Sequence, residues 1–218
     1  MVKAVTMKLI VAVAIALAFA TPELVPQTQG SYESTKSTFK SPDGTFQFEH
    51  RDSVVECKRD PHQPDWWTPD DCEAFTPVCS DGSGTSDATI ACVAYPAGTI
   101  QQGTTFQAAA FSVNEIKEAN TKSKCVSVPE PPPHVGRSHT EKVNGVKFSV
   151  TEIDGVATGN LIDGYVYRNF HEKKCYELDI RIAYSNTGFS DPGTVRNFDL
   201  EEVHRRLRKV LGSFEFLK

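Results

Sequence analysis

Cys175-Tyr176-Glu177-Leu178-Asp179-Ile180-Arg181-Ile182-Ala183-Tyr184 is the stretch that decides the fold. Large apolar side chains occupy every second position from Tyr176 to Tyr184, and most of the positions between them are charged. Successive side chains of a β-strand point to opposite faces of a sheet, so this alternation predicts a strand with one apolar and one charged face. We expect the apolar face to pack against a core and the charged face to point outward.

Segments with the same alternation precede this strand. The dipeptides Asp154-Gly155 and Asp163-Gly164 separate them, and Asp-Gly is typical of tight hairpin turns. The polar run 172–174 would make the last turn. Short turns join antiparallel neighbours, so we predict an antiparallel meander with strands at 146–151, 156–162, 165–171 and 175–184.

Shorter elements are expected earlier in the chain. An opening strand follows the turn Asp43-Gly44, where Phe46 and Phe48 alternate with polar residues. The runs 89–95 and 104–113 are apolar on both faces, which is typical of central strands. We also expect a strand at 53–57 and a short helix at 114–120.

The chain ends in an amphipathic helix over 200–211. Asp199 can cap its start and Gly212 ends it. We attribute the basic residues of the helix, Arg205, Arg206, Arg208 and Lys209, to complementing the helix dipole and to solubility. Its apolar residues form one stripe that would cover the sheet, which predicts an α+β fold: Val203, Leu207, Val210, Leu211 and Phe214.

The first 20 residues have the composition of a secretory signal peptide. Lys3 and Lys8 precede an apolar run from Leu9 to Ala20 that ends in the cleavage pattern Ala18-Phe19-Ala20. Its twelve residues would rise about 18 Å as a helix, short of the ~30 Å hydrocarbon core. We therefore expect a secreted or periplasmic protein with no transmembrane span after cleavage.

Export gives the six cysteines a structural meaning, because an oxidising compartment favours disulfides. Six cysteines allow 15 pairings, and we favour the sequential set. A zinc site that uses Cys79 with His171 or Cys175 is the alternative, but no C-x-x-C pair is present. No metal and no cofactor is expected. The favoured pairs are Cys57 with Cys72, Cys79 with Cys92, and Cys125 with Cys175.

Composition divides the exported chain into a lead-in and one domain. Residues 21–42 are rich in Ser, Thr, Pro and Gln and predict a flexible N-terminal segment. Residues 43–218 would form a single domain. Within it, residues 58–86 are rich in Pro, Asp, Gly and Ser, and they predict a loop insertion stapled by disulfides.

Two motifs resemble those of the PsbP-like domains: the opening Gly-Thr-Phe-Gln-Phe at 44–48 and the ending Val-Leu-Gly-Ser-Phe-Glu-Phe at 210–216. Members of this α/β sandwich family include a photosystem extrinsic subunit and a Ran-binding transport factor. Family members often carry Tyr-Pro after the opening strand, where this chain has His50-Arg51. The resemblance implies a mostly non-catalytic scaffold used for binding, over residues 43–218.

Charge and motifs exclude several function classes. The formal net charge is -5, and cleavage after residue 20 removes two lysines and makes it more negative. Such a chain does not attract nucleic-acid phosphates in general. Neither a Gly-x-Ser-x-Gly elbow, a phosphate-binding glycine loop nor a His-Glu-x-x-His motif occurs in the sequence.

The densest polar chemistry lies on the last predicted hairpin. His171 with Glu177 or Asp179 could act as a general acid or base in a hydrolase, with Arg168 and Arg181 to bind an anion. The alternative is a solvated sheet face with cross-strand ion pairs.

The adjacent Trp66 and Trp67 could stack on a sugar ring, or they could pack onto the insertion's own disulfide. The spacing between His134 and His139 favours a surface role over a metal site. The insertion's aspartates lack the spacing of a calcium loop: Asp65, Asp70, Asp71, Asp81 and Asp87.

We therefore expect a secreted or periplasmic, non-catalytic binding domain, with an unknown protein or small ligand as its partner. Two alternatives stay open: an extracytoplasmic hydrolase that uses His171, and a carbohydrate-binding module that uses Trp66 and Trp67.

Overall fold

The computed structural model describes residues 35–51, 53–59, 67–68, 79, 89–95, 100, 103–127, 134–157, 159–186, 188 and 195–217. The predicted signal peptide and most of the lead-in lie outside these residues. Residue contacts group residues 34–218 into one unit, apart from residues 1–33. Within the described part, neither helix has the length and apolar character needed to cross a bilayer.

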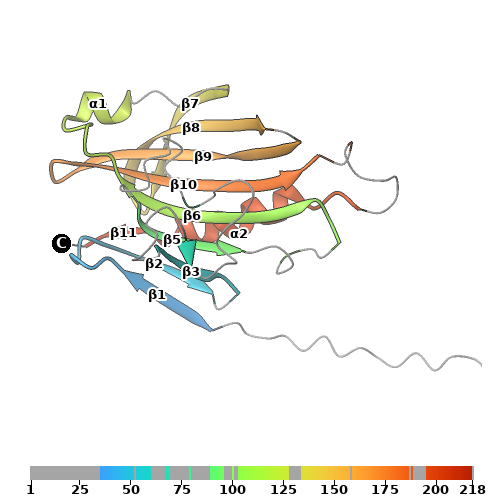
Figure 1. The fold of residues 1–218 in the computed structure, drawn as a ribbon. Helices are drawn as coiled ribbons and strands as arrows, with labels where there is room; N and C mark the ends of the chain where they lie inside the picture. The colour runs from blue at the N-terminus through green and yellow to red at the C-terminus, as the bar shows by residue number, and fades with distance from the viewer. Residues whose placement is uncertain are drawn as a thin grey trace, which may run out of the picture. The chain divides into compact units, whose positions relative to one another are not determined.

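The described strands form two antiparallel sheets (Figure 1). In spatial order, the eight strands of the larger sheet are β4 (Trp67–Thr68), β3 (Val55–Arg59), β5 (Thr89–Tyr95), β6 (Phe106–Glu115), β10 (Lys174–Ser185), β9 (Asn160–His171), β8 (Val146–Ala157) and β7 (His134–Val143). The smaller sheet contains β1 (Lys36–Lys40), β2 (Phe46–Arg51) and β11 (Glu215–Phe216). The two helices are α1 (Lys122–Val126) and α2 (Leu200–Leu211).

The stretch 175–184 forms a strand, as its alternation predicts, and the strand lies in the interior of the larger sheet. It forms most of β10, which pairs with β6 on one side and β9 on the other. Leu178, Ile180 and Ile182 are fully buried on the face that α2 covers. The predicted class is confirmed: an antiparallel sheet packed by a C-terminal amphipathic helix.

The turns predicted at Asp154-Gly155 and Asp163-Gly164 are wrong. Strands β8 and β9 run straight through them, and Asp154 lies opposite Asp163 in the ladder. The chain turns instead near Gly159, whose φ of 83° is in the left-handed region. Asn144-Gly145 and Glu172-Lys173 make the other two turns, with positive φ at all four residues. Local composition indicated the turn type, but pairing with neighbouring strands decided which dipeptides turn.

The backbone of β10 passes so close to Gly164 that no side chain fits at this position. A Cβ built at this position would collide with the backbone carbonyl oxygen of Ile180. The glycine of the second predicted turn therefore lets two long strands approach each other inside the sheet.

Gly164→Ala should destabilise the fold by about 1–3 kcal/mol, because the new methyl group forces the β9 and β10 backbones apart. Chemical denaturation would measure this loss. Val156→Ala, at an exposed position of β8, should change stability by less than about 0.5 kcal/mol. Equal stability of the Gly164→Ala and wild-type chains would contradict the close approach.

Three further predictions need correction. The helix expected at 114–120 is wrong, because Asn114 and Glu115 end β6 and the helix forms at 122–126 with the hydroxyl of Thr121 as its cap. Residues 36–40 were expected to be flexible, but they form β1, which pairs with β2. Strand β7 was not expected, and it adds an edge strand beside β8.

Helix α2 has the bounds that the sequence predicts. The Asp199 side chain accepts a hydrogen bond from the Glu202 backbone amide, which satisfies a free donor at the helix start. The predicted apolar stripe is buried against β10 and β6. Leu207 is fully buried there, and Phe214 beyond the helix packs on Phe46 of the smaller sheet. The helix and the smaller sheet together cover one face of the larger sheet.

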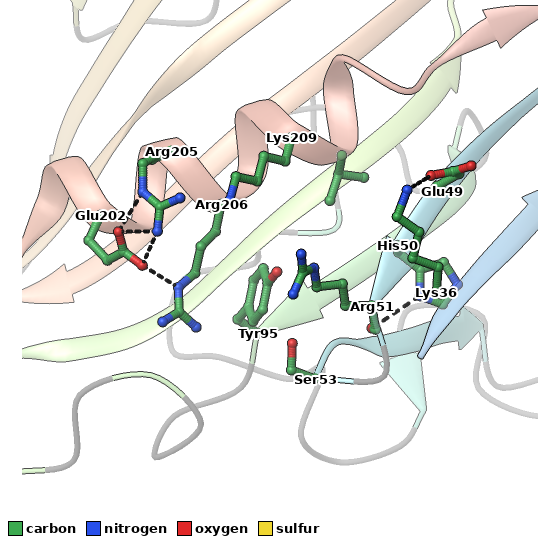
Figure 2. Close-up of a pocket in the computed structure, with 11 residues that line it drawn as sticks. Lys36, Glu49, His50, Arg51, Ser53, Tyr95, Glu202, Arg205, Arg206 and Lys209 are labelled. Atoms are coloured by element: carbon green, nitrogen blue, oxygen red, sulfur yellow. Dashed lines mark hydrogen bonds and ion pairs between the residues drawn. The ribbon is translucent and has the colours of Figure 1, made fainter. Parts of the chain in front are cut away.

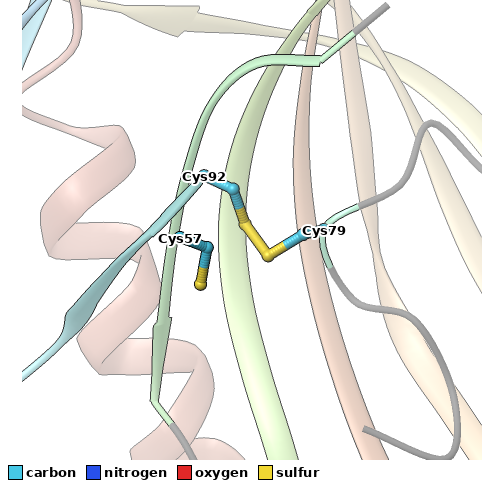
Figure 3. A group of neighbouring side chains, drawn as sticks. All are labelled: Cys57, Cys79 and Cys92. Atoms are coloured by element: carbon cyan, nitrogen blue, oxygen red, sulfur yellow. A yellow bond between two sulfur atoms is a disulfide. The ribbon is translucent and has the colours of Figure 1, made fainter. Parts of the chain in front are cut away.

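Two of the expected disulfides, Cys79–Cys92 and Cys125–Cys175, are present. Cys57 is also disulfide-bonded, and its predicted partner Cys72 lies outside the described residues. Cys57 and Cys92 are directly paired residues of β3 and β5, so their sulfur atoms lie close together (Figure 3). The bonds Cys79–Cys92 and Cys125–Cys175 attach Cys79 and helix α1 to the face of the sheet opposite α2.

Asp43 fixes the turn that starts β2. Its carboxylate accepts hydrogen bonds from the hydroxyl and the amide of Thr45, at 2.7 and 3.2 Å. The hydroxyl of Thr45 is the main cause that lowers the pKa of Asp43 to about 2, and the hydroxyl of Ser41 and the ammonium of Lys174 lower it further. The folded chain therefore holds this carboxylate in its charged form.

Asp43→Asn should lower the free energy of unfolding at pH 7, by at most about 1 kcal/mol because the carboxylate is half exposed. A carboxyl group whose pKa is lower in the folded chain stabilises it above the unfolded pKa, and this contribution disappears as the pH falls through the folded pKa. The gap to wild type should therefore shrink below pH 4 and vanish below about pH 2 in urea denaturation. The exposed Glu118→Gln is the control, and a gap for Asp43→Asn that stays constant with pH would contradict the assignment.

Candidate functional site

One face of the larger sheet carries buried charged side chains. Arg168 on β9 and Glu177, Asp179 and Arg181 on β10 lie on the face opposite α2, and each exposes 6% or less of its surface. The Nε of Arg168 donates to Glu177 at 2.7 Å, and Arg181 donates to Asp179 at 3.1 Å. Asn114 of β6 also donates to Asp179, at 3.2 Å. These ion pairs and hydrogen bonds connect side chains of β6, β9 and β10 on this buried face.

The expectation that this charged face points outward is wrong. Alternation shows which side chains share a face, but it does not show what covers them. Among the described residues, α1 lies against β9, the disulfide Cys125–Cys175 joins α1 to β10, and Cys79 is tied to β5. Arg168 and Arg181, expected to bind a ligand, instead form buried ion pairs.

The sheet does not bring His171 together with Glu177 or Asp179. His171 is an odd number of positions from Arg168 along β9, so the two side chains point to opposite faces. The His171 ring stacks on Phe216 of the smaller sheet, with the ring centroids 3.9 Å apart. The arrangement expected for a hydrolase is therefore not formed.

The other predicted positions contribute little to a described site. Trp66 lies outside the described residues, and Trp67 is placed only by the pairing of its backbone with Arg59. His139 lies on β7, 3.9 Å from Glu141, with both side chains about half exposed. The two cysteines of the zinc alternative are both disulfide-bonded.

A pocket of about 470 Å³ lies beside α2 (Figure 2). One wall comes from β1 and β2, the other from α2, and Tyr95 at the end of β5 lies between them. We call it the basic pocket, and its lining residues are Lys36, Glu49, His50, Arg51, Ser53, Tyr95, Glu202, Arg205, Arg206, Lys209 and Val210.

The basic pocket carries an excess of positive charge. Five of its lining residues are lysine or arginine and two are glutamate, an excess of three with His50 neutral. The whole chain has a net charge of -5. The charge of the pocket is therefore opposite in sign to that of the protein around it.

Glu202 holds two of the arginines in place. Its carboxylate accepts hydrogen bonds from Nε and Nη2 of Arg205, both at 2.7 Å, and from Nε of Arg206 at 2.8 Å. These bonds lower the pKa of Glu202, with Arg206 as the largest cause. Arg206 makes this contact through its Nε, and its guanidinium group lies beside Tyr95 (Figure 2).

Tyr95 places a neutral hydroxyl group in the pocket. Burial is the main cause that raises the pKa of this phenol, while the hydrogen bond with Ser53 and the charges of Arg206 and Arg51 act in the opposite direction. The phenol therefore stays protonated at neutral pH and can donate a hydrogen bond. Figure 2 shows the arginine side chains on either side of the ring.

Sequence reasoning missed this pocket. It named Arg205, Arg206 and Lys209 but assigned them to the helix dipole, and it noted His50-Arg51 only as a departure from a family motif. The available signal was a chain of negative net charge with clustered basic residues on its last helix. The sequence does not show that this helix lies beside β1 and β2.

No known family model and no curated protein matches this chain. The solution structure of cyanobacterial PsbP from Synechocystis is similar to it, with a TM-score of 0.45, 9% identity, and coverage of 88% of this chain and 99% of that chain. A crystal structure from Bacteroides thetaiotaomicron has a TM-score of 0.43 and 10% identity over 83% of this chain and 48% of that chain. This chain thus spans about half the length of the Bacteroides protein. One of these two structures is a PsbP, and both likenesses concern the fold alone.

Proposed function

We propose that this chain is an extracytoplasmic, non-catalytic domain that binds an anionic ligand in the basic pocket. One observation carries the proposal: a pocket with three excess positive charges on a chain with a net charge of -5. Guanidinium groups favour carboxylate, phosphate and sulfate, because their planar array of N–H donors matches these groups.

The size of the pocket favours a small ligand. Its volume of about 470 Å³ is within the range of small-molecule sites, which run from about 300 to 1,000 Å³. The negative charge of the rest of the chain opposes binding of an extended polyanion such as nucleic acid, as the sequence predicts.

Disulfides support a location outside the cytoplasm, since they form and persist in oxidising compartments. Cleavage of residues 1–20 stays a prediction, as does the choice between the periplasm and the medium. Carbohydrate binding by Trp66 and Trp67 also stays a prediction, because no described side chain bears on it.

The double variant Arg51→Gln/Arg206→Gln should weaken binding of inorganic phosphate and sulfate about tenfold or more, because both charges flank the hydroxyl of Tyr95. Isothermal titration calorimetry in low-chloride buffer would measure this. Lys142→Gln/Lys147→Gln, two exposed positions on β7 and β8, makes the same change of net charge and should leave binding unchanged. If wild type binds neither anion, or if both double variants bind alike, the proposal fails.

The variant Glu202→Gln tests whether the anion is bound by arginines held in fixed positions or only by the positive charge of the pocket. If charge alone attracted the anion, removal of this carboxylate would strengthen binding. Since Glu202 holds Arg205 and Arg206 in position, we expect binding of inorganic phosphate to weaken at least threefold instead. Glu201→Gln, at an exposed position on the same helix turn, is the control. Tighter binding by Glu202→Gln would contradict the positioning role.

A further inference from the structure

The basic pocket is much larger than a simple oxyanion. Each water molecule occupies about 30 Å³ in the liquid, so an ion with four oxygen atoms needs roughly 100 Å³. The pocket offers about 470 Å³. Most of its volume is therefore available to the rest of a larger ligand that carries the anionic group. We call this remaining part the body of the ligand.

The charged groups divide the pocket into two regions. Arg51 and Arg206 reach Tyr95 and Ser53 from the two walls, and this region concentrates cations and hydroxyl groups (Figure 2). Lys36 and Glu49 lie farther along the wall formed by β1 and β2, where they form a 2.7 Å ion pair. The first region suits an oxyanion, and the second presents both donors and acceptors.

Most of the described side chains that line the pocket are charged or polar. Among the lining residues that the structure describes, only Tyr95 and Val210 have largely apolar side chains, and they expose 3% and 4% of their surface. An aromatic or aliphatic body would contact mainly the stems of the long charged side chains, and it would desolvate their charged ends without replacing their hydrogen bonds. In the described part of the lining, no tyrosine, tryptophan or phenylalanine presents an exposed ring on which a nucleobase could stack.

Hydroxyl groups match this second region. The Glu49 carboxylate accepts hydrogen bonds and the Lys36 ammonium donates them, and a hydroxyl group can do both. The side chain of Lys36 is 67% exposed and that of Glu49 is 49% exposed, so a ligand can reach this pair without breaking a buried contact.

We propose that the basic pocket recognises a phosphate or sulfate monoester of a polyhydroxylated molecule, such as a sugar. The oxyanion lies between Arg51 and Arg206 at the hydroxyl groups of Tyr95 and Ser53, and the hydroxyl groups of the body contact Lys36 and Glu49. This inference rests on the proposed function, because it specifies the ligand of the same pocket.

Calorimetric titration of the full chain with glucose 6-phosphate tests the ligand class. We expect it to bind at least tenfold more tightly than inorganic phosphate, and more tightly than phenyl phosphate, which has the same charge but an apolar body. Glucose alone should bind at least a hundredfold more weakly than glucose 6-phosphate. Glucose 6-sulfate distinguishes a phosphate from a sulfate preference, and tighter binding of either ester than of its inorganic ion supports the inference.

Variants separate the two regions. Glu49→Gln should weaken binding of glucose 6-phosphate at least fivefold while inorganic phosphate binds as in wild type or more tightly. Arg206→Gln should weaken binding of both. Lys142→Gln, away from the pocket, is the control for charge.

Failure of the two ideas can be distinguished. If inorganic phosphate binds and the sugar esters bind no more tightly, or if phenyl phosphate binds as well as glucose 6-phosphate, the inferred class is wrong and the anion site stands. If none of the esters and neither inorganic ion binds, both fail.

Discussion

The packing of α2 on the larger sheet is the contact on which the rest of the structure depends. Leu207 and its apolar neighbours are buried against β6 and β10, and Phe214 continues the contact onto the smaller sheet. Burial of such side chains is the main favourable contribution to folding. The same packing fixes the outer side of α2 beside β1 and β2, and this placement creates the basic pocket from residues that are distant in the sequence.

The opposite face of the sheet is held together differently. Charged pairs such as Arg168–Glu177 are buried there, and buried ions cost desolvation energy that only good geometry offsets. Disulfides attach α1 and Cys79 to the same face, which reduces the entropy of the unfolded chain. These pairs therefore belong to the architecture of the domain, and the exposed charges beside α2 remain as the candidate binding groups.

Within the basic pocket, carboxylates shape the positive charge rather than cancel it. Glu202 pairs with Arg205 and Arg206, and Glu49 pairs with Lys36. A paired arginine loses side-chain freedom before a ligand arrives, so binding costs less conformational entropy. This preorganisation explains how a small pocket could select an anion on a protein that repels anions elsewhere.

The sequence by itself determined the elements whose signals are local. The alternation in 175–184 gave β10, the spacing of Val203, Leu207 and Val210 gave α2, and cysteine order gave two disulfides. The tertiary structure alone decided that strands run through Asp154-Gly155 and Asp163-Gly164, that the charged face is covered, and that Arg51 and Arg206 line the same pocket. The physical reason is that periodicity records which side chains share a face of one element, whereas turns, covers and pockets depend on which other elements pack against that face.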